Sequence, residues 1–365
     1  MSGESKGRPS LASEHSPRVF RLKASTGKVY HAHLVLQRAR RLEDVVMALL
    51  VCPAHTLALR GILATGALAA ALAGSGCIEM VGADLGKYVE RDEKHFSVAG
   101  KPDVTLSTFD GSIEIRPWDR PDVQVVVEKR GRDKDDVAAI EVNATQTGDH
   151  VEVTVTEPKN RGAGGFDIHF NNFRSAKLIV SLPASSDVAA RSGDGSIDIE
   201  RVTGRMQLRS GDGSIRGRRL GGDVTAHTGD GAIKLDGVNG ALDVDTGDGS
   251  ITVAGRLTSV RARSGDGSVT VRAEPGSAPG GDWDIVTGDG SVTLEVPDGF
   301  GAELDAHTGD GGIHMQDITL SNVSGTIGKH TVRGRLGSGG PALRVRTGDG
   351  SITLRQSLSA ERGEP

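Results

Sequence analysis

A six-residue motif recurs along the C-terminal half of this 365-residue chain. It reads Ser or Thr, Gly, Asp, Gly, a small residue and then Ile or Val, and it occurs eight times. The first five copies follow one another at intervals of 18 residues, and the later intervals are 23, 21 and 39. Such regular spacing predicts a repeat architecture, and the longest interval predicts one degenerate coil within residues 322–340. The motif aspartates are Asp194, Asp212, Asp230, Asp248, Asp266, Asp289, Asp310 and Asp349.

Each repeat alternates apolar and polar residues with the period of a β-strand. In one repeat, Leu242 and Val244 are expected to point inward and the residues between them outward, and Ile251 resumes the inward position after the turn. The Gly-Asp-Gly turn therefore joins two strands, and a second glycine-containing turn, such as residues 237–240, closes the unit. We expect the turn glycines to supply the positive φ that tight turns need.

Two architectures are compatible with this unit. An antiparallel meander gives no reason for eight turns to share one sequence, whereas a β-solenoid stacks each turn on its equivalent in the next coil. The composition of 52 Gly with only 2 Trp, 2 Tyr and 7 Phe suits a narrow core. We therefore predict an all-β fold, a single-stranded β-solenoid (β-helix) of roughly 18-residue coils with an irregular N-terminal β cap.

The predicted cap lacks the full motif but is rich in strand patterns. Residues 104–115 hold a degenerate copy of the repeat, in which Phe109 replaces the first glycine. Further strands are expected at 123–128, 150–156 and 177–182, with a loop at 161–165. The predicted segments are a basic leader at 1–59 that is disordered or precedes the true start, a signal at 60–77, a linker at 78–95, irregular β coils at 96–183, regular repeats at 184–356 and a disordered tail at 357–365.

Charge divides the chain at Cys77, with ten basic and four acidic residues before it and 33 and 44 from there onward. The acidic remainder excludes a dedicated nucleic-acid binder. The apolar run at 61–74 has the pattern of a secretory signal and is shorter than the roughly 20 residues that cross a bilayer. A Cys after a small residue resembles the lipobox of bacterial lipoproteins, which implies lipidation of Cys77, although Gly74 stands where that motif usually has Leu. The alternative is an uncleaved signal anchor that extends upstream through residues 45–50.

Several segments together resemble a known family. They are residues 96–98 (Phe-Ser-Val), 108–113 (Thr-Phe-Asp-Gly-Ser-Ile), 177–183 (Lys-Leu-Ile-Val-Ser-Leu-Pro) and the serial Gly-Asp-Gly-Ser-Ile turns. They are similar to the bacterial adhesin-like β-solenoid family of unknown function, over roughly residues 96–354. The resemblance implies a β-solenoid outside the cytoplasm, anchored at the cell envelope, and it carries no established activity and no catalytic residues.

The aspartates of the motif form the sharpest candidate site. Stacked carboxylates about 4.8 Å apart would repel one another by roughly 1 kcal/mol per pair in water. In one interpretation each Asp caps turn amides and faces solvent, with arginines such as Arg191 and Arg209 nearby. In the other, adjacent carboxylates share Ca²⁺, although hard cations need six to eight oxygens. The candidate Ca²⁺ ligands are Asp194, Asp212, Asp230, Asp248 and Asp266, and no other cofactor is indicated.

An enzyme of the β-helix polysaccharide-active class is a further alternative. Ser192 or Ser264 could act as a nucleophile only with a positioned base, and His227 and His307 are expected to face solvent. From residue 174 onward the aromatic residues are Trp283 and Phe300, and Trp283 occupies an inward position. The repeats therefore lack the aromatic platforms on which sugar rings usually stack. We therefore predict a non-catalytic adhesion or scaffold module, attached to the membrane, whose partners are an envelope polymer or a surface protein.

Overall fold

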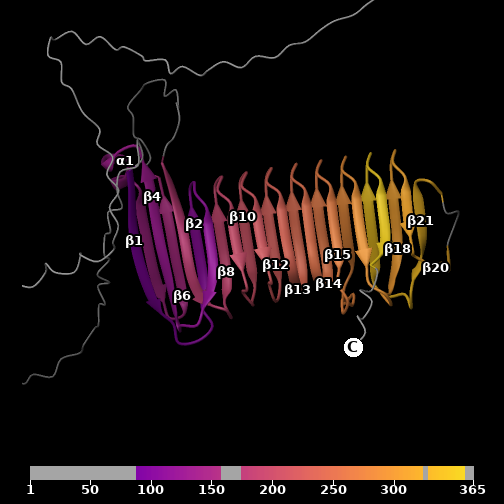
Figure 1. The fold of residues 1–365 in the computed structure, drawn as a ribbon, viewed down its shortest axis with the longest axis horizontal. Coiled ribbons are helices and arrows are strands. Elements are labelled where there is room, and N and C mark those ends of the chain that lie inside the picture. The colour runs from indigo at the N-terminus through magenta and orange to yellow at the C-terminus, as the bar shows by residue number, and fades with distance from the viewer. Residues whose placement is uncertain (1–87, 158–173, 324–327, 358–365) are drawn as a thin grey trace, which may run out of the picture. The chain divides into compact units, whose positions relative to one another are not determined.

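The computed structural model describes residues 88–157, 174–323 and 328–357 (Figure 1). The predicted leader, the signal with Cys77, the loop at 161–165 and the tail beyond residue 357 lie outside these residues. The described part is almost entirely β-structure, with 23 strands and one short helix, α1 (Lys134–Ala138). The all-β prediction is therefore confirmed.

Two ladders of parallel strands run along the described solenoid. Ladder A contains the strand before the motif turn in every coil, and ladder B contains the strand after it. Equivalent residues pair in register, Ala190 with Leu208 and Leu208 with Ala226, which confirms the β-solenoid and excludes the meander. In stacking order, ladder A consists of β2 (Asp103–Thr108), β8 (Asp187–Ser192), β10 (Met206–Ser210), β12 (Val224–Thr228), the C-terminal parts of β13 (Ile233–Thr246) and β14 (Ile251–Ser264), β16 (Trp283–Thr287), β22 (Ala342–Thr347) and β18 (Ala302–Thr308). In the same order, ladder B consists of β3 (Ile113–Trp118), β9 (Ile197–Glu200), β11 (Ile215–Arg218), the N-terminal parts of β13 and β14, β15 (Val269–Ala273), β17 (Val292–Val296), β23 (Ile352–Gln356) and β19 (Ile313–Gln316).

We number the coils 1 to 9 in this stacking order, which departs from chain order at one end. The last coil in the sequence, β22 with β23, lies between β16 and β18 and is therefore coil 8. The prediction of a degenerate coil within residues 322–340 is wrong. That segment contains β21 (Thr331–Leu336), which pairs antiparallel with β18 and with β20 (Leu320–Ser321). It lacks a Gly-Asp-Gly turn to carry the chain into ladder B, so it folds back over coil 9 as a cap.

The N-terminal cap closes the opposite end of the solenoid. The degenerate repeat at 104–115 forms coil 1, because β2 and β3 pair in parallel with β8 and β9. Beyond it, three strands run antiparallel in the order β1, β4, β7, and a hairpin of β5 and β6 covers β2. The strand β1 begins at Tyr88, inside the stretch predicted to be a linker. It was not predicted because its many charged residues hide the alternation of apolar and polar residues that is typical of a strand. The cap strands are β1 (Tyr88–Ser97), β4 (Asp122–Gly131), β5 (Glu141–Thr147), β6 (His150–Thr156) and β7 (Ser175–Pro183).

The core is a narrow set of columns between the two ladders. Most inward positions carry Val, Ile, Leu or Ala, which are almost completely buried in coils 1 to 8. In the terminal coil 9, Ile313 and Met315 of ladder B are half-buried. Trp283 is also inward, as predicted, and its ring meets that of Phe300 edge to face at 5.1 Å. Outward residues of ladders A and B form two polar surfaces, which we call face A and face B.

Candidate functional site

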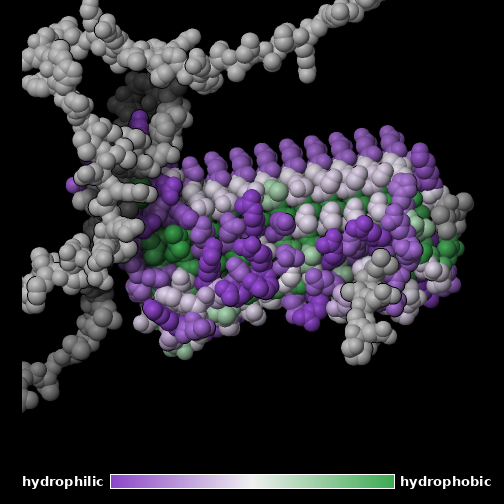
Figure 2. Space-filling view, viewed as in Figure 1, coloured by the Kyte–Doolittle hydropathy of each residue, from purple (hydrophilic) through white to green (hydrophobic). Residues whose placement is uncertain are grey.

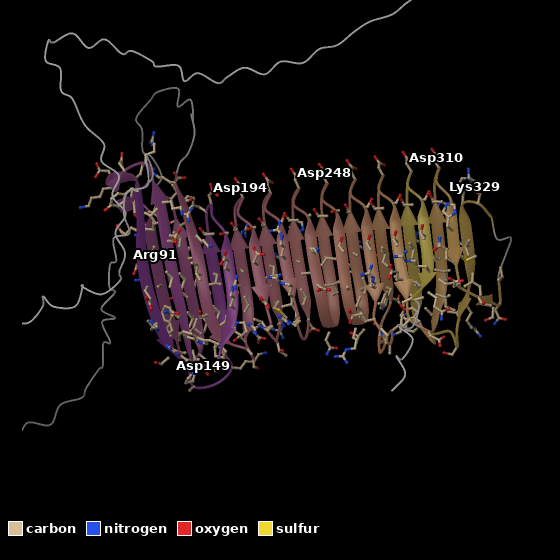
Figure 3. All side chains as sticks on the ribbon, in the orientation of Figure 1. Arg91, Asp149, Asp194, Asp248, Asp310 and Lys329 are labelled. Carbon is tan, nitrogen blue, oxygen red and sulfur yellow. The ribbon has the colours of Figure 1, made fainter. Side chains whose placement is uncertain are left out.

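The motif aspartates form a continuous row along one edge of the solenoid. All eight side chains are exposed, and Figure 3 shows Asp194, Asp248 and Asp310 pointing away from the ladders along that edge. Figure 2 shows the same edge as a regular row of hydrophilic groups. Asp110 lies in the equivalent turn of coil 1, next to the turn of Asp194. Burial, and then the negative charge of Asp194, raise the pKa of its carboxyl group.

The Ser or Thr of the motif holds the turns together. Thr246 Oγ1 donates a hydrogen bond to the carbonyl oxygen of Gly231 in the preceding coil at 3.0 Å. Ser264 Oγ donates in the same way to Gly249 at 2.8 Å, and it also accepts from the backbone N–H of Gly267 in its own turn at 3.0 Å. These buried hydroxyl groups form a ladder of their own, which the sequence analysis missed. Its members are Ser192, Ser210, Thr228, Thr246, Ser264, Thr287, Thr347 and Thr308.

The glycines of the motif are needed for a different reason from the one predicted. The eight Gly-Asp-Gly pairs do not adopt positive φ, which occurs instead in the second turn at residues such as Gly222 and Gly240. The motif glycines allow a close approach between coils: a Cβ atom on Gly249 would lie 2.1 Å from the carbonyl oxygen of Gly231. The backbone N–H of Gly247 donates to the carbonyl of Gly229 at 2.6 Å across the same interface. Absence of a side chain, not backbone freedom, is the requirement here.

The expected partners of the aspartates are not found. Within the described residues, the side chains of the eight motif aspartates make no hydrogen bond to turn amides, since the Ser or Thr hydroxyl takes that role. The arginines expected nearby pair elsewhere or not at all; Arg263, for example, binds Asp284 at 2.8 Å. Asp194, Asp212, Asp230, Asp248 and Asp266 lie in one row, and no group of three or more potential metal ligands gathers in the described part of the chain. Calcium binding by these residues stays a prediction.

The hydroxyl groups of the two candidate nucleophiles, Ser192 and Ser264, make hydrogen bonds between the turns of adjacent coils. Ser192 Oγ donates to the carbonyl of Gly111 at 2.8 Å, and Ser264 is hydrogen-bonded as described above. His227 and His307 are exposed on face A, and their nearest polar partners are Asp245 and Thr331, at 3.8 and 3.0 Å. The structure thus does not bring either serine together with either histidine.

Face A carries alternating charges over coils 5 to 9. One outward column reads Asp243, Arg261, Asp284, Arg344 and Asp305 in successive coils. Ion pairs join these coils and their neighbours, including Arg263 with Asp284 at 2.8 Å, Arg344 with Asp282 at 3.1 Å and Arg333 of the cap with Asp305 at 2.9 Å. The hydrogen bond to Asp284 raises the pKa of Arg263 above its ordinary value. These pairs fix the outward side chains in position.

The charges stop at coil 5 in this column, because its members in coils 2 to 4 are Ala189, Gln207 and Thr225. In the adjacent outward column, Arg191, Arg209 and His227 follow one another in the same coils and lead to Asp245 of coil 5. Within the described residues, neither arginine has an ion-pair or hydrogen-bond partner. Beside them lies a shallow hollow of about 640 Å³ that extends to Thr225 and to Asp245 of coil 5. The sequence predicts Arg191 and Arg209 near the motif aspartates, and the hollow beside them was not predicted. The signal was available, because residues 18 apart become neighbours.

Comparison with known proteins agrees with this architecture. The sequence profile of the family described as Toastrack DUF4097 matches residues 103–355. No curated protein matches the chain. No helix in the described residues is long and apolar enough to cross a membrane.

Several solved structures are similar to this chain at low sequence identity. A candidate cell adhesion protein from Clostridium sporogenes is 12% identical, with 73% of this chain and 100% of that chain covered and a TM-score of 0.23. A candidate adhesin from Bacteroides fragilis is 11% identical, with 73% and 97% covered and a TM-score of 0.34. A candidate lipid binding protein from Parabacteroides distasonis is 12% identical, with 73% and 97% covered and a TM-score of 0.37.

Proposed function

Because this chain belongs to the Toastrack DUF4097 family, we propose that it is a non-catalytic adhesion or scaffold module on the extracytoplasmic side of the cell envelope. The observation that carries the proposal is face A, a flat surface on which charged side chains stand in fixed rows. Such a surface can make many similar contacts with an extended partner. Weak contacts repeated along one rigid support give strong total binding.

The stack makes face A rigid. Each strand of ladder A between the ends is hydrogen-bonded on both edges, so neighbouring rows keep a spacing of about 4.8 Å. Interstrand ion pairs such as Arg333 with Asp305 further restrict the side chains. A partner therefore meets groups that are already ordered, which reduces the entropy that binding must offset.

A non-catalytic role is supported by the hydrogen bonds that the motif serines make to backbone carbonyls. Ser192 and Ser264 are buried and serve as hydrogen-bond donors to backbone carbonyls. A nucleophilic hydroxyl needs an adjacent base within hydrogen-bond reach. The described neighbours of these serines are turn glycines, which cannot supply one.

Binding and catalysis can be tested in one experiment. Lipid-extracted envelope polymer is incubated with the full-length chain, sedimented, and examined for bound protein and for newly formed polymer ends. The proposal expects the chain to sediment with the polymer and the polymer to be recovered uncut. Protein that stays in the supernatant would contradict the adhesion role, and cut polymer would favour the enzyme alternative.

We further propose that Cys77 carries a lipid anchor. Support comes from the small residues before Cys77 and the short apolar run before them. A multiply acylated Cys would hold the solenoid at the membrane, whereas a single chain binds only marginally. Replacing Cys77 by Ser should release the chain into the soluble fraction of cells; a Cys77→Ser chain that stays in the membrane fraction would instead support an uncleaved signal anchor.

Calcium binding is the second candidate function, favoured by the row of exposed carboxylates. Asp194, Asp212, Asp230, Asp248 and Asp266 are the proposed ligands. Each pair of adjacent coils offers two carboxylates about 4.8 Å apart, and water would complete the six to eight oxygens that Ca²⁺ needs. Calorimetric titration of the full-length chain should then give saturable heat that is lost when Asp230 and Asp248 are changed to Asn. A flat titration would remove this candidate.

A further inference from the structure

Two neighbouring arginines on face A stand apart from the charge pattern of the rest of the face. From coil 5 onward, outward arginines such as Arg263 and Arg344 have carboxylate partners within 4 Å. Arg191 and Arg209 lie side by side in coils 2 and 3, and within the described residues no carboxylate comes that close to either. Like charges at this spacing repel, so an anion placed between them would be attracted to both.

We propose that Arg191 and Arg209 bind the carboxylate of an acidic polysaccharide that lies along face A. This inference rests on the proposed adhesion function and names its ligand class. Guanidinium groups offer planar pairs of N–H donors that match the two oxygens of a carboxylate. The two arginines come from in-register strands, so their side chains start from fixed points on adjacent coils.

The hollow beside the arginines supplies groups for the rest of a sugar unit. It measures about 640 Å³, and its floor includes Thr225 and Ala226. On the far side, Asp243 and Asp245 of coil 5 offer carboxylate oxygens that can accept hydrogen bonds from sugar hydroxyl groups. Asp194 of coil 2 also lines the hollow and adds a third carboxylate acceptor. The hollow therefore combines two guanidinium donors with three acceptors for sugar hydroxyl groups in one site.

The composition of the hollow favours an acidic sugar over other anionic partners. Ala226 is the only apolar residue among those that line it, whereas the centres of protein interfaces are rich in aromatic and other apolar anchors. A polyphosphate would place further negative charge against Asp243 and Asp245. A uronic acid unit has one carboxylate and several hydroxyl groups, which is the combination that the donors and acceptors of the hollow can satisfy.

The inference can be tested with labelled oligogalacturonate as the probe. Binding of the full-length chain is measured by fluorescence anisotropy, with neutral dextran, polyglutamate and polyphosphate of similar length as comparisons. We expect saturable binding of the uronate oligomer only. The dissociation constant should rise about tenfold or more for Arg191→Gln and again for Arg209→Gln, since each removes a charged hydrogen bond.

Arg216→Gln is the matched control. Arg216 lies in coil 3, like Arg209, is exposed, and has no ion-pair partner within the described residues, but it projects from face B. Its replacement should leave the affinity for the uronate oligomer unchanged, and all three variants should keep the melting temperature of the unchanged chain. Equal binding by the Arg191→Gln/Arg209→Gln double variant, or no uronate binding at all, would overturn the inference. If that double variant still sediments with envelope polymer, the adhesion function stands and only this site falls.

Discussion

Replacing Gly249 by Ala should destabilise the solenoid near its centre. The new Cβ would lie 2.1 Å from the carbonyl oxygen of Gly231, and real Cβ contacts essentially never fall below 3.0 Å, so the two turns must separate by about 0.9 Å. That movement lengthens the hydrogen bonds from Thr246 Oγ1 to Gly231 and from the N–H of Gly247 to Gly229 beyond their useful range. Two lost bonds at about 1 kcal/mol each, with a buried hydroxyl left unpaired at about 1–3 kcal/mol, give about 3–5 kcal/mol.

Part of this cost is offset, because Ala restricts the unfolded chain more than Gly does, by about 0.4–1 kcal/mol. We therefore expect Gly249→Ala to lower the free energy of unfolding by about 2–4 kcal/mol, measured by urea titration of the full-length chain. Gly280→Ala is the control, since the nearest atom to its Cβ is 3.9 Å away and its φ is not positive. It should leave stability unchanged or raise it slightly. If Gly249→Ala changed the stability by less than about 1 kcal/mol, the close-approach argument would be refuted.

Three further predictions concern the hydroxyl ladder, the aspartate row and coil 8. Thr246→Val should cost about 1–3 kcal/mol in urea unfolding because it leaves the carbonyl of Gly231 without its donor, whereas the exposed Thr252→Val should change little; equal effects would contradict the ladder. Because the folded-state pKa of Asp110 is raised, the unfolding free energy should fall as the pH rises from the ordinary carboxyl range through that raised pKa, and Asp110→Asn should flatten this part of the profile, an outcome checked by thermal melts across pH. A chain ending at residue 340 should lose hydrogen-exchange protection in β19, whose strand partner β23 is removed, while keeping it in β10 and β12; protection retained in β19 would mean that coil 9 can stack directly on coil 7.

The regular part of the fold was predictable because equivalent positions in every coil share the same environment and therefore carry the same sequence motif. An interval of 18 residues places Leu208 beside Ala190, and the period of two assigns both to the core. The degenerate repeat with Phe109 also stacks as predicted. In such a fold, register follows from the repeat length, so long-range neighbours can be read directly from the sequence.

The features that escaped prediction depend on relations outside a single repeat. The position of coil 8 between coils 7 and 9 cannot be inferred from the repeats, because identical turns stack equally well in either order. The role of the motif glycines depends on the distance between adjacent backbones, which the sequence does not contain. The hollow beside Arg191 and Arg209 could have been found by aligning the repeats and noting which outward charges lack an opposite neighbour.

The position of coil 8 also determines how a solenoid of this type can change in length. The cap strand β21 and coil 9 precede coil 8 in the chain, so residues added after β23 have no free ladder edge to extend. Coils 3 and 4, by contrast, contact only the coils on either side through the same turn hydrogen bonds. Duplication of one 18-residue segment there would lengthen the solenoid by about 4.8 Å and leave both caps intact. Growth from within adds a new row to face A each time, so length and surface charge pattern change together.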